Sequence, residues 1–207
     1  MSGGICIAGR AGSGKSPLAQ HIVSAFSQYG IPAKKLSFAD ALKQEVWELY
    51  GVRKGDLGSR ELLISHGEGR TALDPTYWVR RLMPRVEACW SEGAIPVVDD
   101  VRREPEFSRL SYESFFRVRV LAPLVLRRAA LEKNGLDPDF ATSDDPTERH
   151  HEVWRYDFRR VLMHTGQDYC DAAAQIVQAS GLALRAATPT GRSSEALPRL
   201  VQPLPNC

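Results

Sequence analysis

The strongest constraint on the fold is an eight-residue segment near the amino terminus. Residues 9–16 fit the pattern G-x-x-x-x-G-K-S and follow a short apolar run at residues 5–8. A strand, a glycine-rich loop and a helix in this order bind the phosphates of a nucleoside triphosphate through backbone N–H groups and the helix N-terminus. We therefore expect ATP to bind at this phosphate-binding loop (P-loop), which comprises Gly9, Arg10, Ala11, Gly12, Ser13, Gly14, Lys15 and Ser16.

Two side chains of the P-loop carry chemistry. Lys15 supplies a mobile positive charge for the outer phosphates, so we expect it to be catalytic. The hydroxyl of Ser16 is in the position that binds Mg²⁺ in such loops. The motif thus predicts ATP and Mg²⁺ as the cofactors.

Composition limits the class of protein. The chain has 207 residues, 43% of them hydrophobic, and no interior linker rich in proline, glycine and serine, so we expect one domain with one sizeable core. A formal net charge of +2 is too small to indicate nucleic-acid binding. The first strand begins too early to leave room for a signal peptide, and no apolar run reaches membrane-spanning length. We expect a cytoplasmic protein without a membrane partner.

Strand and helix patterns alternate along the chain. Further strands are predicted at residues 32–38, 94–98, 116–121 and 160–164, and helices at 18–29, 40–50, 60–66, 75–92, 123–134 and 168–179. This alternation predicts an α/β fold of the P-loop NTPase type, with a mostly parallel sheet covered by helices on both faces. Ligands then bind at the carboxyl ends of the strands.

Two segments lack this periodicity. Residues 135–152 are polar, charged and rich in turn residues, which predicts a mobile lid. From residue 186 the chain loses its pattern, so we assign residues 1–185 to the folded domain and expect residues 186–207 to be a disordered tail.

Three carboxylates come at predicted strand ends. Asp99 and Asp100 follow the strand at 94–98, where a carboxylate beside a P-loop reaches Mg²⁺; the alternative is a capping or turn aspartate. Asp40 follows the strand at 32–38 and is a candidate base for a hydroxyl acceptor. It equally suits the N-cap of the helix that begins there, and the two roles can coexist.

Arginines supply the expected contacts to phosphate. Arg127 and Arg128 precede the lid, so we expect one of them to contact the transferred phosphoryl group, because adjacent helix positions face different ways. Arg60, Arg70 and Arg102 are candidates to bind an acceptor phosphate. Trp78, beside a candidate acceptor helix, can stack on a base or simply pack.

Several segments resemble one known family. The P-loop, residues 37–43 (Ser-Phe-Ala-Asp-Ala-Leu-Lys), Arg60 with residues 66–70, residues 74–78 and residues 98–102 (Val-Asp-Asp-Val-Arg) are similar to those of phage-type deoxynucleoside monophosphate kinases, relatives of thymidylate kinase. The resemblance covers about residues 1–170. It implies that Lys15 and Ser16 serve ATP and Mg²⁺, and that the lid uses an arginine. It also implies an acceptor site at Asp40, Arg70 and Arg102, and a homodimer.

Two departures from the family pattern affect the acceptor. The family commonly continues Phe-Pro-Asn-Glu after the stretch that ends at Arg102, where this chain has Arg103, Glu104, Pro105 and Glu106. Pro17 replaces the more usual threonine, which the first turn of a helix tolerates. The pattern also resembles a branch of phage enzymes that phosphorylate 5-hydroxymethyluracil in DNA, a step in thymine hypermodification and evasion of host restriction.

Three features favour this DNA acceptor: Asp40, the altered stretch after Arg102, and the basic aromatic run at residues 149–156, which includes Trp154. We therefore expect ATP-dependent phosphorylation of 5-hydroxymethyluracil in phage DNA to 5-phosphomethyluracil. The alternative is a deoxynucleoside monophosphate kinase that makes dNDP from free dNMP. A third hypothesis is a P-loop ATPase without a phosphoryl acceptor.

Overall fold

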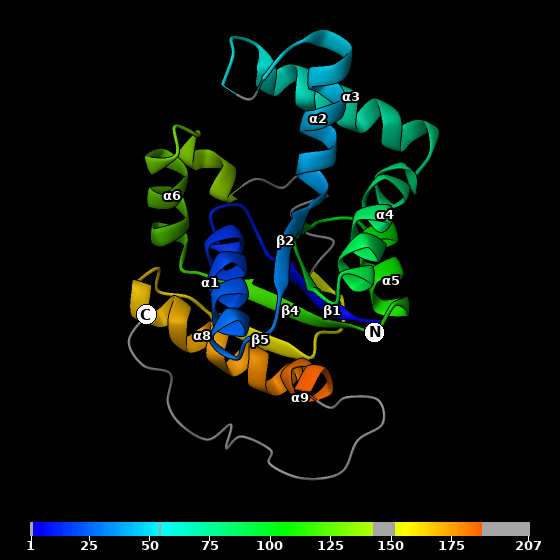
Figure 1. Cartoon of the computed structure of the whole chain (residues 1–207). Helices are drawn as coiled ribbons and strands as arrows, with labels where there is room; N and C mark the ends of the chain where they lie inside the picture. Colours follow the sequence, from blue (N-terminus) through cyan, green and yellow to red (C-terminus); the bar gives the residue numbers. More distant parts are fainter. Residues whose placement is uncertain (1, 54, 143–151, 188–207) are drawn as a thin grey trace.

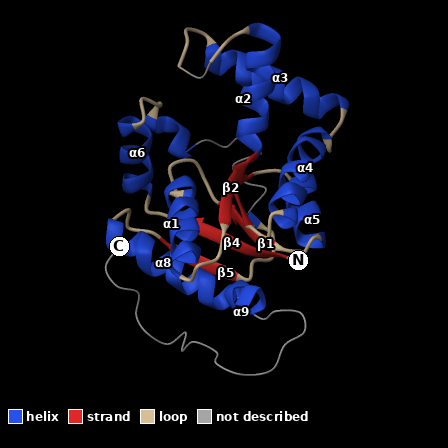
Figure 2. Ribbon diagram, viewed as in Figure 1, coloured by secondary structure: helices blue, strands red, loops and turns tan. Residues whose placement is uncertain are grey.

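A five-stranded parallel sheet lies at the centre of the computed structural model, which describes residues 2–53, 55–142 and 152–187 (Figures 1 and 2). The strands run in the spatial order β2-β3-β1-β4-β5, and each adjacent pair is parallel. Their bounds are β1 Gly4–Ala8, β2 Ala33–Ser37, β3 Ile95–Val101, β4 Phe115–Leu121 and β5 Phe158–Val161. The prediction of an α/β fold with a parallel sheet is confirmed.

Helices cover both faces of this sheet. The helices are α1 Lys15–Gln28, α2 Phe38–Tyr50, α3 Ser59–Leu73, α4 Tyr77–Ser91, α5 Glu104–Tyr112, α6 Leu124–Lys133, α8 Gly166–Ser180 and α9 Leu182–Ala187, with a 3₁₀ helix η1 at Pro138–Thr142. Figure 1 shows α1, α8 and α9 on one face and α4 and α5 on the other. Helices α2 and α3 extend away from the sheet beyond β2, and α6 with η1 stands on the other side of α1.

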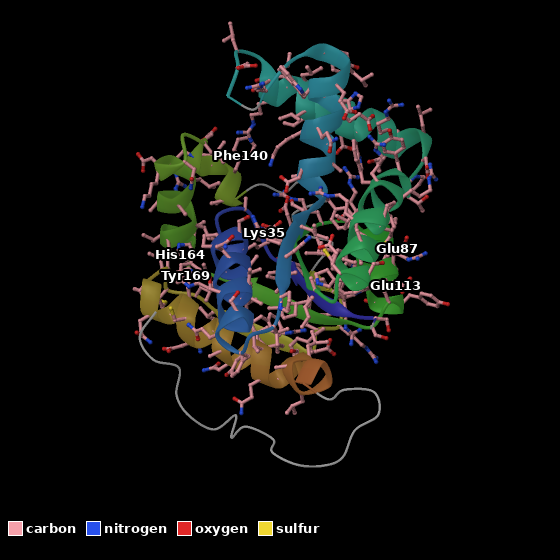
Figure 3. All side chains as sticks on the ribbon, in the orientation of Figure 1. Lys35, Glu87, Glu113, Phe140, His164 and Tyr169 are labelled. Atoms are coloured by element: carbon pink, nitrogen blue, oxygen red, sulfur yellow. The ribbon has the colours of Figure 1, made fainter. Side chains whose placement is uncertain are left out.

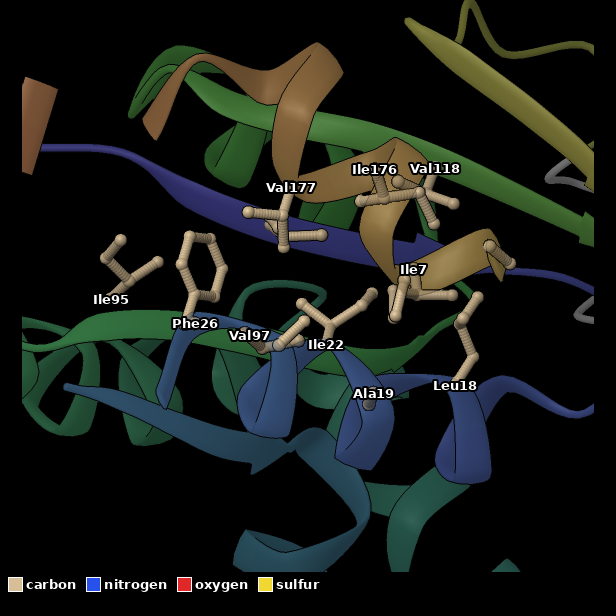
Figure 4. Packing of buried hydrophobic residues seen from close by; sticks show 14 of the residues in the cluster. Ile7, Leu18, Ala19, Ile22, Phe26, Ile95, Val97, Val118, Ile176 and Val177 are labelled. Atoms are coloured by element: carbon tan, nitrogen blue, oxygen red, sulfur yellow. The ribbon is translucent and has the colours of Figure 1, made fainter. Parts of the chain in front are cut away.

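The buried strand β1 divides the core into two parts. Ile5 and Ile7 point to one face and belong to the cluster that contains Ile22 of α1 and Ile176 of α8 (Figure 4). Cys6 and Ala8 alternate with them and belong to the cluster built by α4 and α5, among other elements. Strand β1 is buried along its whole length because helices cover both of its faces.

The structure differs from the sequence-based expectations at several elements. Helix α5 was not predicted, β3 extends to Val101 instead of residue 98, and β5 begins at Phe158 instead of residue 160. Within the expected lid, Pro138–Thr142 forms η1, and residues 143–151 lie outside the described residues. Helix α9 runs two residues into the expected tail, and residues 188–207 lie outside the described part of the chain.

A membrane-spanning helix is absent from the described residues: no helix among them is both long enough and apolar enough to cross a bilayer.

Candidate active site

A cleft of about 790 Å³ opens at the carboxyl ends of the strands. Its walls come from the P-loop, β2, α2, α3, the end of β3, the segment from α6 to η1, and the segment from β5 to α8. Figure 3 shows Lys35, Phe140, His164 and Tyr169 around this region, and all four line the cleft. Glu87 and Glu113 lie away from it, on the side of α4 and α5. The cleft therefore joins the predicted nucleotide loop to the elements expected to bind an acceptor.

The P-loop presents an open helix N-terminus to the cleft. Helix α1 begins at Lys15, and its N-cap Gly14 provides no side-chain hydrogen bond. The first turn contains no acidic residue. The first N–H groups and the positive end of the helix dipole are thus available for an anion. This is the local structure that the sequence motif predicted.

Two glycines allow other elements to approach the P-loop closely. Gly12 has φ 73°, and a Cβ there would lie 2.4 Å from the carbonyl oxygen of Arg127. Gly14 has φ 90°, and a Cβ there would lie 2.5 Å from the hydroxyl of Tyr169. Positive φ values disfavour other residues at both positions. The two glycines therefore allow the P-loop to pack closely against both α6 and α8.

Lys15 is held inside the loop by backbone oxygens. Its Nζ donates to the carbonyl oxygen of Gly9 at 2.6 Å and to that of Arg10 at 3.1 Å. The same Nζ lies 3.6 Å from Oδ1 of Asp100. The ammonium group thus lies between the loop backbone and a carboxylate, at the loop whose amides suit a phosphate.

A bulge in β3 allows two adjacent carboxylates to face the P-loop. Cys6 pairs with Val98 but Ala8 pairs with Val101, so β3 has one extra residue in this interval. Asp100, within it, has φ 62°. Adjacent residues of a regular strand face opposite sides of the sheet, but here Asp99 contacts Ser16 while Asp100 lies near Lys15. Both residues were expected after the strand and instead lie within it.

Asp99 and Ser16 fit a magnesium site. Oδ2 of Asp99 accepts a 2.5 Å hydrogen bond from Oγ of Ser16 and lies 3.1 Å from Nζ of Lys35. Asp99 is 1% exposed, and its second oxygen, Oδ1, is buried without a hydrogen-bond partner among the described residues. Mg²⁺ takes oxygen ligands from one or two side chains together with water and substrate phosphates. A hydroxyl and a carboxylate at the N-terminus of α1 match that chemistry.

Asp100 is a strongly ionised carboxylate. Burial opposes its charged form, but the charges of Arg102 and Lys15 and the hydrogen bonds from both outweigh burial and lower its pKa to about 2. Nε of Arg102 donates to Oδ1 of Asp100 at 2.9 Å. Asp100 therefore links Lys15 of the P-loop to Arg102, a residue expected on the acceptor side.

Asp40 faces the cleft and does not cap α2. The N-cap is Ser37, whose Oγ accepts from the backbone N–H of Ala39 at 3.2 Å. The capping alternative for Asp40 is therefore wrong, because the helix begins at Phe38, two residues earlier than expected. Asp40 lies in the first turn, where its Oδ1 accepts a 2.9 Å hydrogen bond from Nζ of Lys43. Asp40 and Lys43 both line the cleft.

Helix α3 presents one face to the cleft and the other to a buried carboxylate. Its cleft-lining residues follow a helical spacing: Arg60, Leu63, Ile64, Gly67 and Glu68. Arg70 is not brought into the cleft, although sequence reasoning placed it there. Its Nε donates instead to Glu45 at 2.8 Å, and Glu45 is 4% exposed and also bonds Tyr77 and His66.

Four predicted acceptor residues line the cleft: Asp40, Arg60, Trp78 and Arg102. The guanidinium of Arg60 lies 3.9 Å from the ring centroid of Phe140 in η1. Trp78 is 6% exposed, and its Nε1 donates to the carbonyl oxygen of Gly67 at 3.3 Å. Trp78 therefore serves as packing and as cleft wall at once. The contact between Arg60 and Phe140 joins α3 to the lid side of the cleft.

The two arginines of α6 do not line the cleft in this structure. The backbone of Arg127 packs against Gly12. Nη2 of Arg128 pairs with Oδ1 of Asp139 in η1 at 2.9 Å. Their expected contact with the transferred phosphoryl group would need a movement of α6 or of the lid.

The aromatic residues of the run at 149–156 are part of the core. Trp154 is 8% exposed and stacks on Phe107 with ring centroids 4.4 Å apart, and Tyr156 packs against the same ring. Phe107 of α5 thus covers the ring of Trp154, whereas Tyr156 is only partly buried, and contact of this run with DNA stays a prediction. Residues 149–151 lie outside the described residues.

Several cleft residues were missed in the sequence. Lys35 pairs with Asp99, and its alternation with Lys34 in β2 was the available signal. Glu106 is buried and accepts from the backbone N–H groups of Arg102 at 2.9 Å and Arg103 at 3.1 Å. A capping-box position three residues into α5 was the signal there. His164 has φ 60° and lies beside Gly14, where no sequence signal pointed.

Comparison with solved structures supports the fold assignment. The chain is similar to TT1252 from Thermus thermophilus (TM-score 0.55, 22% identity, 86% of this chain and 97% of that chain). It is also similar to the tunicamycin resistance protein of Deinococcus radiodurans (0.52, 18%, 87% and 96%) and to the Mycobacterium tuberculosis APS kinase CysC solved with AMPPNP and APS (0.50, 16%, 86% and 97%). No protein-family model and no curated protein matches the sequence. At these identities the similarity establishes the fold alone.

Proposed function

We propose that this protein is a magnesium-dependent kinase that transfers the γ-phosphoryl group of ATP to a deoxynucleotide. The observation that carries the proposal is that a single cleft joins the P-loop, the Ser16–Asp99 pair and a separate group of acceptor-side charges. An ATPase needs only the first two features. The acceptor-side charges favour transfer to a second substrate.

The donor side of the cleft binds the triphosphate. The open N-terminus of α1 and the amides of the P-loop bind the β- and γ-phosphates, and Lys15 leaves its backbone partners to contact them. Ser16 and Asp99 hold the metal, which neutralises phosphate charge when bound. The APS kinase with a similar fold was solved with the ATP analogue AMPPNP, which agrees with this assignment.

The acceptor side of the cleft favours an anionic substrate. It is lined by four cationic residues, Lys43, Arg60, Arg102 and Arg103, and by the carboxylates of Asp40, Glu68 and Glu106. Lys43, Arg102 and Arg103 are paired with Asp40, Asp100 and Glu68, and the guanidinium of Arg60 lies over the ring of Phe140. Planar guanidinium groups bind phosphate with two parallel hydrogen bonds. Leu42, Leu63 and Trp78 add apolar wall for a base. We therefore assign a free deoxynucleoside monophosphate as the acceptor that this geometry supports best, with dNDP as product.

The reaction is a direct displacement at phosphorus. An oxygen of the acceptor phosphate attacks the γ-phosphorus of ATP, the bond to the β,γ-bridging oxygen breaks, and ADP leaves. An acceptor phosphate is already anionic at neutral pH, so it needs no base. Lys15 stabilises the charge that develops on the transferred group and on the leaving oxygen.

One observation favours a second acceptor, 5-hydroxymethyluracil in DNA. Asp40 lines the cleft in the first turn of α2 and is not used as the helix cap, so it is available to take a proton from a hydroxyl group. Transfer to that hydroxyl would give 5-phosphomethyluracil. The basic aromatic run gives this acceptor less support than the sequence suggested, since Trp154 and Tyr156 are packed on Phe107.

One experiment separates the acceptors. The protein is incubated with ATP labelled in the γ-phosphate and with dTMP, dGMP, hydroxymethyl-dUMP or a hydroxymethyluracil-containing duplex. Label in a free diphosphate supports the monophosphate kinase, and label only in DNA supports the base kinase. Label in neither, with ATP still bound, would overturn both acceptors.

A further inference from the structure

Lys35 is a cation in the cleft to which neither the P-loop motif nor the proposed reaction gives a task. It belongs to β2, one of the two edge strands of the described sheet, and lines the cleft together with Ser37 of the same strand. Figure 3 shows it near the centre of the molecule, close to β2 and α1. The strand period places Lys35 and Ser37 on one face and the neighbouring Lys34 on the other.

The two adjacent lysines have different environments. The side chain of Lys34 is 51% exposed and pairs with Glu92 at the protein surface. The side chain of Lys35 is 32% exposed, and its Nζ lies 3.1 Å from Oδ2 of Asp99. The chain therefore carries its own matched pair of lysines, one in the cleft and one outside it.

Lys35 contacts the oxygen of Asp99 that also accepts from Ser16. A carboxylate that is 1% exposed requires a compensating positive charge or full hydrogen bonding, because burial removes its hydration. Lys35 supplies that charge here. A divalent metal held by Ser16 and Asp99 would supply the same compensation, so the ammonium group and the metal compete for one carboxylate.

We propose that Lys35 is a tethered cation that sets the metal affinity of the cleft. It holds Asp99 in place when the metal is absent and is displaced from Oδ2 when the metal binds. This inference rests on the proposed metal site at Ser16 and Asp99. Lys35 is a positioning residue, because it acts through Asp99 and not on the reacting atoms. Its positive charge weakens metal binding while it keeps the buried carboxylate ordered.

The test uses Mn²⁺ alone as the probe and measures its binding by electron paramagnetic resonance, without any assay of activity. Lys35→Met removes the competing charge, so its dissociation constant for Mn²⁺ should fall by roughly three- to tenfold relative to wild type. Lys34→Met is the matched control and should stay within about twofold of wild type, since an exposed charge is screened. Without metal, Lys35→Met should melt below wild type, and Mn²⁺ should raise its melting temperature more.

A second variant, Lys35→Gln, provides the same test if Lys35→Met does not fold. Lys35→Gln keeps a donor for Asp99 but removes the charge, and it should also bind Mn²⁺ more tightly. Equal or weaker Mn²⁺ binding by the folded variants would overturn the inference, and so would equal tightening in Lys34→Met. Asp99→Asn distinguishes the underlying site: if it leaves wild-type Mn²⁺ binding unchanged, the proposed metal site itself is wrong.

Discussion

Oγ of Ser16 lies 2.5 Å from Oδ2 of Asp99, although the two residues are 83 positions apart in the sequence. The contact exists because β1 and β3 are adjacent parallel strands, so the P-loop that follows β1 meets the end of β3. Asp99 comes two residues after Val97, which packs with α1, so strand alternation directs Asp99 toward the same helix. A local loop motif and a distant carboxylate thus form one candidate metal site.

Asp99→Asn is expected to weaken the response to Mg²⁺. The neutral amide keeps the volume and can still hydrogen-bond Ser16, but it removes the negative charge that a metal requires. We expect the Mg²⁺ concentration for half-maximal phosphoryl transfer to rise by at least about tenfold, measured at saturating ATP. Asp74→Asn, at the C-cap of α3 and outside the cleft lining, is the control and should leave that concentration unchanged.

Lys15→Ala is expected to lower phosphoryl transfer by about a hundredfold or more, because it removes charge that stabilises the transition state. The substitution also leaves the carbonyl oxygens of Gly9 and Arg10 and the carboxylate of Asp100 without this partner, which should cost about 1–3 kcal/mol of folding free energy. Rates from a coupled ADP assay and a urea unfolding curve check the two parts. A variant that keeps most of its activity would contradict the role of Lys15.

Asp40→Asn separates the two acceptors by mechanism. With a hydroxyl acceptor, loss of the base should lower the chemical step by roughly 10²- to 10⁴-fold. With an acceptor phosphate, we expect a loss of less than about tenfold, because the attacking oxygen is already ionised. Single-turnover rates with dTMP and with the hydroxymethyluracil duplex measure both. Because Ser37 caps α2, the substitution should leave helix stability nearly unchanged.

Gly12→Ala tests the close packing of the P-loop on α6. A Cβ at this position would meet the backbone of Arg127 at 2.4 Å, and backbone atoms cannot move aside as a flexible side chain can. We expect loss of nucleotide binding in calorimetric titration with AMPPNP. Gly93→Ala is the control, since Gly93 has a similar φ of 71° and no atom within 4 Å of its Cβ position. It should cost only about 1–2 kcal/mol of strain and bind AMPPNP normally.

Glu106→Gln tests a pH dependence of stability. Burial raises the pKa of Glu106 from its ordinary value of 4.5 to about 7, despite the opposing hydrogen bonds from Arg102 and Arg103. The folded state therefore binds this proton more tightly than the unfolded chain, so stability is lost as pH rises from about 4.5 to about 7. Glutamine cannot ionise and keeps the acceptor oxygen for both N–H groups.

Relative to Glu106→Gln, wild type should lose roughly 3 kcal/mol of unfolding free energy across this pH range. Urea unfolding at intervals from pH 4.5 to pH 7.5 measures the difference. The control is Glu104→Gln, which changes an exposed carboxylate in the same helical turn and should run parallel to wild type. Parallel curves for Glu106→Gln and wild type would contradict the prediction.

The sequence predicted the P-loop part of the site, because a short continuous segment forms it. The P-loop and the start of α1 needed only the motif, its preceding strand and its glycines. Asp99, Asp100 and Asp40 were recognised because parallel strands end at one rim of the sheet. The approach of Asp100 to Lys15 depends on the bulge between β1 and β3, and no residue pattern signals that bulge.

The remaining differences come from tertiary packing. Arg70 carries the charge expected of a phosphate ligand, but the helical turn of α3 directs it to Glu45, which is buried between helices and needs positive partners. Trp154 and Tyr156 lie in a basic stretch, but α5, an unpredicted helix, supplies Phe107, which packs against both rings. In each case the partner is far away in sequence, so composition and periodicity gave no signal.

We propose that the cleft delivers the γ-phosphoryl group to a nucleotide and does not merely hydrolyse ATP. The most direct measurement is ADP formation from Mg-ATP with and without added dNMP or hydroxymethyluracil DNA, in wild type and in Lys15→Ala. We expect ADP formation that depends on an acceptor, matches the phosphorylated acceptor mole for mole, and is lost in Lys15→Ala. ADP and inorganic phosphate formed at the same rate without any acceptor would contradict it.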